Sequence, residues 1–377
     1  MASQLSLTGF AWKNLWRRRL RTLLTLGGIT MAIGAFVALV GFSRSFEREW
    51  MRLYSTTGTD IAVVERTFIN TSMDESLVTK IEALPMVAKV SPMIFNMMDL
   101  TPEVNALVFG WKSDSYDFDG LELLSGRRFQ DGKPEVMLGD ILSENLNKKT
   151  GDSLDIQGKT FTVVGTYHGG SALETGAMLM PIDQLQEITS LQGKVSGFHV
   201  RLQPAPSGMS QDQWVKQAQV AIDAALPGLH ATPASEWASK NEFVVLAHAV
   251  AWGTSSIALI VGILGIANTM AMSVFERTRE IGILRAIGWN RWSIMALIQI
   301  EAAVLGMAGG IIGIAVGWGA LHLLSSMPQT ATIVSASLSP VDLLQALGIA
   351  LASGLLAGAY PAWRGAHLSP VEAIRHD

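Results

Sequence analysis

The sequence predicts a membrane protein with four transmembrane α-helices and an α+β extracytoplasmic domain of two lobes. Three observations support this fold class. In 377 residues, 49% of the side chains are hydrophobic and 16% are charged, which is too apolar for an ordinary soluble protein. Four long stretches with few or no charges are long enough to cross a bilayer. Roughly two hundred residues of ordinary globular composition separate the first stretch from the second.

The composition also excludes several kinds of site. Cysteine is absent, so the chain has no disulfides and no thiolate metal sites, and an exported domain depends on its hydrophobic core alone. The histidines show no metal-ligand spacing. No basic footprint for nucleic acid appears. We therefore expect no bound metal and no nucleic-acid partner.

The first span follows a basic segment, residues 1–21, which carries five Lys or Arg and no acidic residue. We expect this segment to form an amphipathic elbow on the cytoplasmic surface. Leu23 to Phe42 is a run of 20 residues without a charge and predicts the first transmembrane helix over residues 22–44. Because the run is long and no clear small-x-small cleavage site precedes Ser43, we interpret it as an uncleaved anchor and not as a signal peptide.

Residues 45–242 are expected to form the extracytoplasmic domain. Strand-like alternation at Asp60–Glu65 and helix-like spacing at Glu75–Leu84 recur later at Ser196–Leu202 and Ser210–Leu226. Two such pieces around an insertion predict a split α+β lobe with a mainly β lobe between its parts. Further strands are expected at Lys89–Ile94, Asn105–Trp111 and Leu229–Thr232. The expected bounds are about 58–112 and 194–234 for the α+β lobe and about 113–193 for the β lobe.

Helical periodicity continues beyond the first span. Phe46 and Trp50 extend its apolar stripe, and the stretch from Trp237 to His248 can do the same on the return to the membrane. These residues predict stalks that would carry a motion in the bilayer to the external lobes. Simple support of the domain explains the pattern at least as well.

Three further spans are predicted at residues 243–275, 294–324 and 341–360. A coupling segment at 276–293 and an external loop at 325–340 connect them, and residues 361–377 form a tail.

The distribution of Lys and Arg decides the orientation. Residues 276–293 carry four Arg against two Glu, whereas Ser45 to Lys240 carries 16 basic and 25 acidic residues. By the positive-inside rule, both termini and the coupling segment face the cytoplasm, and the large domain lies outside the inner (cytoplasmic) membrane. Tryptophans beside the predicted cytoplasmic ends fit the preference of indole for the interface: Trp12, Trp16, Trp289, Trp292 and Trp363.

The stretch that follows the second span is the most informative one. Six of the residues from Glu276 to Arg285 are Glu, Arg or Thr. Ile281, Leu284 and Ile287 recur at helical spacing and would share a face that can seat in a groove of a soluble partner. On charge alone, the arginines are better explained as ordinary positive-inside residues.

The third span is rich in glycine at small-xxx-small spacings, which let helix backbones approach closely. We therefore expect tight helix packing, either within the chain or against a second copy. The glycines concerned are Gly306, Gly309, Gly310, Gly313, Gly317 and Gly319.

Glu301 is the one acidic residue well inside a predicted span, and such a carboxylate is costly enough to invite a functional interpretation. It lies only about two turns into the helix. We expect a structural role, with a hydrogen bond to Gln299 or to a neighbouring helix.

No ATP-hydrolysing site is visible. Gly158-Lys159-Thr160 looks like the end of a phosphate-binding loop, but Ser153 stands where the first glycine of that motif belongs. A β-turn between two strands explains these residues better. We expect no catalytic residue, and energy from ATP must arrive through another polypeptide.

Three stretches resemble permeases of the MacB and FtsX family of ABC transporters. Asn268 to Gly288 is similar to the family's loop between the second and third helices, which docks on the ATPase. Ala11 to Thr25 looks like the family's elbow and first helix, and Gly358 to Arg375 looks like its tail. The external domain matches only in general style. The docking residues that the resemblance implies are Glu276, Arg277, Thr278, Arg279, Glu280, Ile281, Gly282, Leu284, Arg285 and Gly288.

The resemblance further implies a permease subunit that works as a homodimer or a related heterodimer above two cytoplasmic ATPase subunits. ATP and Mg would be bound by the ATPase, and this chain would bind no cofactor. Closure of the ATPases would push the coupling segment and move the external lobes, a mechanism called mechanotransmission. The substrate, whose binding residues are unknown, would be handled outside the membrane.

Three functions stay open at this point. The chain can belong to an exporter with a periplasmic adaptor, to a permease that extracts lipids or lipoproteins from the outer leaflet, or to an FtsX-type regulator of a cell-wall hydrolase. The size of the external region favours the first two.

Overall fold

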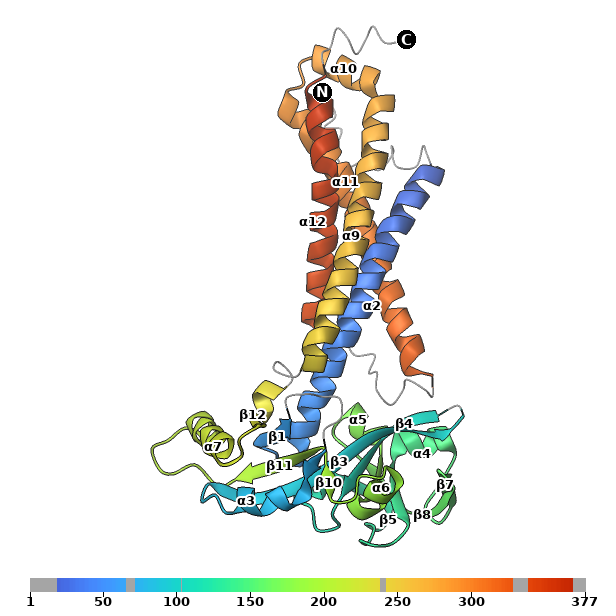
Figure 1. Ribbon diagram of the computed structural model, residues 1–377. Coiled ribbons are helices and arrows are strands. Elements are labelled where there is room, and N and C mark those ends of the chain that lie inside the picture. The colour runs from blue at the N-terminus through green and yellow to red at the C-terminus, as the bar shows by residue number, and fades with distance from the viewer. Residues whose placement is uncertain (1–18, 66–71, 103, 238–241, 328–337, 369–377) are drawn as a thin grey trace. The chain divides into compact units, whose positions relative to one another are not determined.

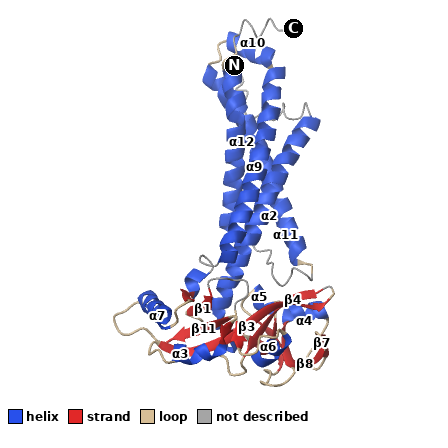
Figure 2. Cartoon of the chain, in the orientation of Figure 1, coloured by secondary structure: helices blue, strands red, loops and turns tan. Residues whose placement is uncertain are grey.

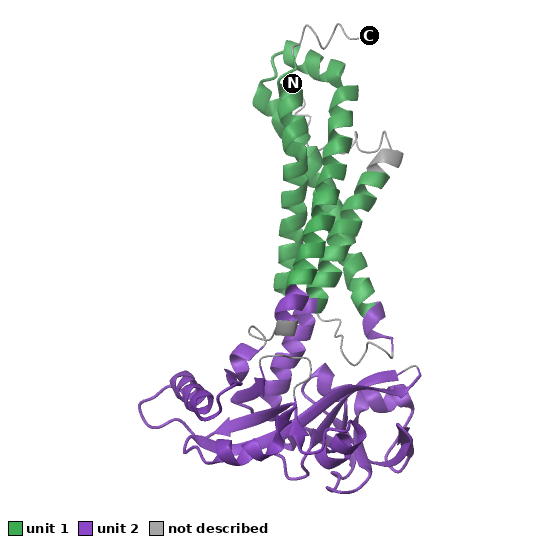
Figure 3. Ribbon diagram, viewed as in Figure 1, with its two compact units in different colours: residues 1–42, 249–322, 336–377 green, residues 43–248, 323–335 purple. Residues whose placement is uncertain are grey.

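The computed structural model describes residues 19–65, 72–102, 104–237, 242–327 and 338–368. The chain divides into two compact units (Figure 3). The membrane unit comprises residues 1–42, 249–322 and 336–377, and the external unit comprises residues 43–248 and 323–335. Most of the expected elbow and of the external loop, and the end of the tail, lie outside the described residues.

Five helices make up the described part of the membrane unit or enter it (Figure 1). Four of the described helices are long and apolar enough to cross a membrane, which confirms the four predicted spans. A short helix, α10, lies between the second and third of them. The helices are α2 (Arg19–Thr57), α9 (Glu242–Glu276), α10 (Thr278–Ala286), α11 (Arg291–Ser325) and α12 (Pro340–Ala366).

Helix α12 is longer than predicted. The expected span ended at Tyr360, but the helix continues through Pro361 to Ala366. Pro361 has no N–H to bond the preceding turn, which ordinarily kinks or ends a helix. Here Pro361 and Ala362 are both buried in the bundle, and this packing offsets the lost backbone hydrogen bond.

Five of the six glycines predicted to pack in α11 lie against other helices of the same chain. A Cβ at Gly317 would meet the carbonyl oxygen of Gly34 in α2 at 2.7 Å, and one at Gly306 would meet the carbonyl oxygen of Ala350 in α12 at 2.7 Å. Gly309 and Gly313 likewise face α2, and Gly310 faces α12. Gly319 has no described atom within 4 Å of such a Cβ. One helix therefore uses two glycine rows to approach two neighbours.

The external unit contains a ten-stranded sheet (Figure 2). Its strand order is β12-β1-β11-β3-β4-β9-β6-β8-β5, with β7 paired to β8. A second, two-stranded sheet pairs β10 with β2. The strands are β1 (Ile61–Glu65), β2 (Met73–Asp74), β3 (Val87–Thr101), β4 (Val104–Trp111), β5 (Glu122–Gly126), β6 (Glu135–Gly139), β7 (Ser153–Ile156), β8 (Lys159–His168), β9 (Met178–Pro181), β10 (Lys194–Val195), β11 (Gly197–Leu202) and β12 (Leu229–Pro233).

Short helices accompany the strands of the external unit. The longest, α7, begins after a capping box at Ser210 and packs against β12. It corresponds to the helix predicted at Ser210–Leu226. The helices are η2 (Glu75–Leu77), α3 (Val78–Glu82), η3 (Tyr116–Gly120), α4 (Asp140–Leu146), α5 (Ala172–Thr175), α6 (Ile182–Ile188), α7 (Gln211–Ala225) and η4 (Ala234–Glu236).

Strand β3 runs through the predicted α+β lobe of the external unit. Its first part, up to Met93, pairs with β11, and its second part, from Ile94, pairs with β4. The separated sequence pieces of the α+β lobe therefore do come together, through β1, β11 and β3. The sheet nevertheless runs on into the inserted segment through the parallel pair β4 and β9. The two-lobe division stays a prediction.

The β-turn predicted at Gly158 is present. Gln157 and Gly158 both have positive φ, 50° and 83°, and connect the antiparallel strands β7 and β8. Two residues of positive φ are typical of a tight hairpin turn. The resemblance of Gly158-Lys159-Thr160 to a phosphate-binding loop is therefore only one of sequence.

Candidate functional site

Local backbone signals divide the coupling segment, residues 276–293. Arg277 leaves helical geometry, with φ of −106° and ψ of 16°, and thereby separates α9 from α10. Gly288 has φ of +105°, which favours glycine, and its N–H donates to the carbonyl of Arg285. Asn290 then caps α11, because its Oδ1 accepts the Ser293 N–H at 2.7 Å. The predicted charged helix is thus a separate element.

One face of α10 packs against the membrane unit to which it belongs. Ile281 is buried in the apolar core of that unit, and Leu284 packs against the same core. Gly282 is also buried. The Nη1 of Arg285 donates to the backbone carbonyls of Ala366 and Leu368, at 3.0 and 2.8 Å, where α12 ends.

The opposite face of α10 is exposed. Ile287 is 71% exposed and Ile283 is 48% exposed, and Arg279 and Glu280 are exposed beside them. The predicted common face of Ile281, Leu284 and Ile287 is therefore wrong, because α10 ends at Ala286 and Ile287 no longer follows the helical stripe. Ile283 was missed, since it lies off that stripe.

Arg277 forms an ion pair with Glu301 across two helices. Its Nη1 lies 2.9 and 3.1 Å from the two carboxylate oxygens of Glu301, and its Nε lies 3.3 Å from Glu280. The Glu301 side chain is 5% exposed and that of Arg277 is 18% exposed. The neighbouring helix, and not Gln299, supplies the expected partner of Glu301. Arg277 thus points into the membrane unit and not away from it.

The external unit presents a second cluster, which we call the stalk foot: the last part of α2, Trp50 to Thr57, and Gly58 after it, with the side chains around them. The Trp50 and Trp237 rings stack with centroids 5.0 Å apart, and Phe46 lies edge-on to Trp50 at 6.1 Å. Trp50, Tyr54 and Trp237 are buried. The three predicted stalk residues, Phe46, Trp50 and Trp237, are therefore neighbours.

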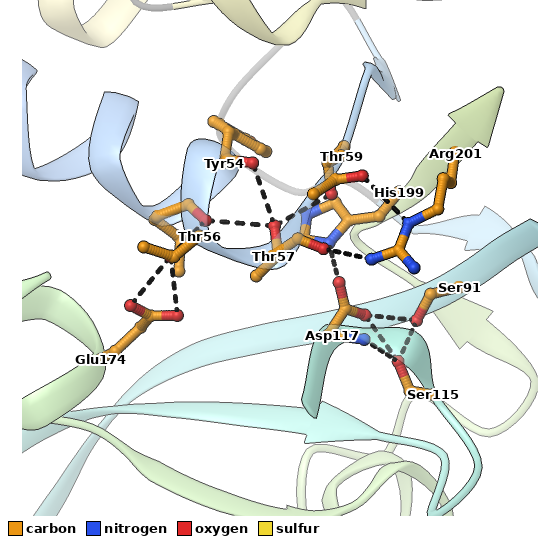
Figure 4. Close-up of polar contacts among 12 residues, drawn as sticks. Tyr54, Thr56, Thr57, Thr59, Ser91, Ser115, Asp117, Glu174, His199 and Arg201 are labelled. Carbon is orange, nitrogen blue, oxygen red and sulfur yellow. Dashed lines mark hydrogen bonds and ion pairs between the residues drawn. The ribbon is translucent and has the colours of Figure 1, made fainter. Parts of the chain in front are cut away.

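Polar contacts attach α2 to α5 and to the loop before it (Figure 4). Thr56 Oγ1 donates to the Glu174 carboxylate at 3.2 and 3.3 Å, and Glu49 Oε2 accepts the Ala172 N–H at 2.7 Å. The fit is close, since a Cβ at Gly170 would lie 2.1 Å from Thr56 Cγ2. Burial raises the pKa of Glu174 to about 7, although hydrogen bonds from Ser171 and Thr56 oppose the rise.

On the other side of the stalk foot, Asp117 is completely buried (Figure 4). Its carboxylate contacts His199 Nδ1 at 2.8 Å and accepts the Ser91 and Ser115 hydroxyls at 2.5 and 2.7 Å. Burial raises the pKa of Asp117, but the charge of His199 and these hydrogen bonds outweigh it and leave the pKa below its ordinary value. Arg201 donates to the carbonyls of Thr57 and Gly58.

The serine, histidine and aspartate of this cluster do not form a catalytic triad. Both serine hydroxyls bond the carboxylate, and the other ring nitrogen of His199, Nε2, is buried without a hydrogen-bond partner among the described residues. In a triad the serine would bond the imidazole. The arrangement instead satisfies a buried charge beside the end of α2.

Comparison with known proteins gives matches along most of the chain. The family model of the MacB-like periplasmic core domain matches residues 22–219, and that of the FtsX-like permease C-terminal region matches residues 252–370. An ABC transporter permease of Methanocaldococcus jannaschii, described as uncharacterized, is 27% identical over 97% of this chain and 96% of its own length.

The macrolide export ATP-binding/permease protein MacB of Hyphomonas neptunium is 25% identical, over 97% of this chain but 60% of its own length. The periplasmic region of MacB from Actinobacillus actinomycetemcomitans is a structural neighbour with a TM-score of 0.39 and 12% identity, covering 48% of this chain and 92% of that one. Since the periplasmic core model alone spans more than half of the sequence, the chain belongs to the MacB/FtsX-type family of ABC transporter permeases.

Proposed function

We propose that this chain is the permease subunit of an ABC exporter. A separate cytoplasmic ATPase binds and hydrolyses ATP with Mg, and the permease converts the ATPase motion into movement of its external unit. The chain works as a dimer in the inner membrane with both termini in the cytoplasm. It acts on its substrate at the outer face. Similarity to a protein named for macrolide export supports export over hydrolase regulation.

The observation that carries this proposal is the two-sided character of α10. Its outer face offers Ile283 and Ile287 beside charged Arg279, which suits an apolar groove with a charged rim on a soluble partner. Its inner face is attached to α11 and α12 through Arg277 and Arg285. A partner that moves α10 therefore moves the membrane helices with it.

The docking test replaces the outer face only. We expect Arg279→Glu combined with Ile287→Asp to abolish copurification of the ATPase in mild detergent, while expression and membrane insertion are unchanged. Lys149→Glu combined with Val220→Asp makes the same changes of charge and polarity on exposed positions of the external unit and serves as the control.

The proposal would be refuted if the α10 variant retained the ATPase as well as the control does. A wild-type chain that copurifies with no ATPase at all would also refute it. An acylated protein or a cell-wall hydrolase bound to the external unit would favour lipoprotein extraction or hydrolase regulation instead of export.

A further inference from the structure

The ion pair between Arg277 and Glu301 has a position that stability alone does not explain. Glu301 lies in α11, which is one of the candidate membrane spans, and its carboxylate is nearly inaccessible. A buried ion pair adds little to stability compared with well-packed apolar residues of similar volume. A carboxylate inside a span is also unfavourable in itself. What the pair provides that apolar contact does not is a directional, charge-assisted hydrogen bond that ties the Arg277 guanidinium to the Glu301 carboxylate.

The position of the arginine indicates which motion the pair restricts. Arg277 is the single residue that interrupts the helical backbone between α9 and α10. A short helix that follows such a break can rotate about it, since only a few backbone dihedrals need to change. The bond from Arg277 Nη1 to both oxygens of Glu301 fixes this break to α11. The guanidinium of Arg285 fixes the other end of α10 to the end of α12.

We propose that Glu301 is a positioning residue for the coupling segment: through Arg277 it holds α10 rigidly on α11, so that displacement of α10 becomes displacement of α11. Without the carboxylate, α10 would turn about Arg277 when a partner pushes it, and the motion would be lost. The second half of this inference rests on the proposed function. The first half, the attachment of α10, does not depend on any partner.

The attachment is tested by hydrogen–deuterium exchange of the amides of residues 278–286 in the full-length permease, purified and placed in nanodiscs. We expect Glu301→Gln to speed exchange in α10 at least tenfold. Asp342→Asn makes the same carboxylate-to-amide change at the capping box of α12 and leaves α10 as in the wild type. Unchanged exchange in Glu301→Gln overturns the proposal.

A second variant separates positioning from general loss of stability. Glu301→Gln combined with Arg277→Gln removes both charges and so leaves no buried charge unpaired. We expect this pair of changes to restore the thermal midpoint toward that of the wild type while exchange in α10 stays fast. If exchange also returns to the wild-type rate, the single variant acted through an uncompensated charge, and the positioning role is wrong.

The consequence for coupling is tested with the ATPase bound. We expect Glu301→Gln to copurify with the ATPase as the wild type does, but to lose the ATP-dependent distance change between spin labels on residue 220 of the two copies. Retention of that distance change overturns the positioning role. If the wild-type chain binds no ATPase, the proposed function is wrong. The hydrogen–deuterium exchange measurement still tests the attachment of α10 in that case, because it needs no partner.

Discussion

At the scale of single residues, the chain places a carboxylate of unusual pKa where α2 meets the external unit. Glu174 is buried, and its carboxylate accepts hydrogen bonds from Thr56 Oγ1, from the N–H and hydroxyl of Ser171, and from the backbone of Gly170. These donors favour the ionised form, but removal from water disfavours it more, so the pKa rises to about 7. The protonation of this contact therefore changes near neutral pH.

We predict that Glu174 makes the external unit less stable as the pH rises from 5 to 8. Its pKa is 4.5 in the unfolded chain and about 7 in the folded chain, so the folded state holds the proton more tightly. The contribution of Glu174 to the free energy of unfolding is fully present below pH 4.5 and is lost as the pH rises through 7. The loss is on the order of 2 kcal/mol. Thermal unfolding of the full-length chain, followed by tryptophan fluorescence at pH 5 and 8, measures this effect.

Glu174→Gln is the matched variant for this measurement. It removes the titrating group and is expected to flatten the dependence on pH and to raise the midpoint at pH 8. Asp117 does not interfere with this measurement. Its pKa lies below 3.8, the pKa of an ordinary aspartate, so it stays ionised between pH 5 and 8. An unaltered dependence on pH in Glu174→Gln would contradict the assignment.

At the scale of elements, much of the fold could be predicted because the signals are local. Apolar runs predicted the four spans, helical spacing from Ser210 to Leu226 predicted α7, and the residues around Gly158 predicted a hairpin turn. The errors lie where packing decides. Helix α12 passes Pro361 because the bundle buries it, and β3 extends to 15 residues because it has different partners along its length.

The candidate site was predictable in location but not in geometry. The charged stretch after α9 marked the coupling segment, but which of its residues point inward depends on contacts that are distant in the sequence. Arg277 and Glu301 are 24 residues apart, and Arg285 bonds carbonyls more than 80 residues away. Thr56 and Glu174 are separated by 118 residues. No periodicity in the sequence reports such pairs.

The glycine rows of α11 give a prediction at this scale. We expect Gly317→Ala to destabilise the membrane unit by about 1–3 kcal/mol, since the new Cβ would lie 2.7 Å from Gly34 O and 2.8 Å from Val37 Cβ. Gly319→Ala, two residues further along the same helix, places its Cβ more than 4 Å from the atoms of the described residues in other helices and serves as the control. Midpoints of thermal unfolding in one detergent provide the comparison. Equal midpoints for both variants would mean that α2 and α11 do not approach so closely.

At the scale of the whole molecule, the orientation of the chain in the membrane decides whether α10 can meet a cytoplasmic ATPase. The chain has no cysteine, so a single introduced thiol is the only one present. We predict that Ile283→Cys in spheroplasts reacts with a membrane-impermeant maleimide only after the membrane is opened. Val220→Cys, exposed on α7 of the external unit, is expected to react at once. Prompt labelling at residue 283 would place α10 outside and end the coupling proposal.

Strand β4 also determines how chimeras of this protein with its relatives can be built. Since β4 pairs with β3 on one side and with β9 on the other, a chimera that exchanges only residues 113–193 would replace β9 but keep β4, and so pair two strands that evolved in different chains. A chimera should instead exchange the entire stretch from β1 to β12, Ile61 to Pro233, because all the described strands of the large sheet lie within it. Swapping that block between family members would keep every strand of the large sheet with its own partners.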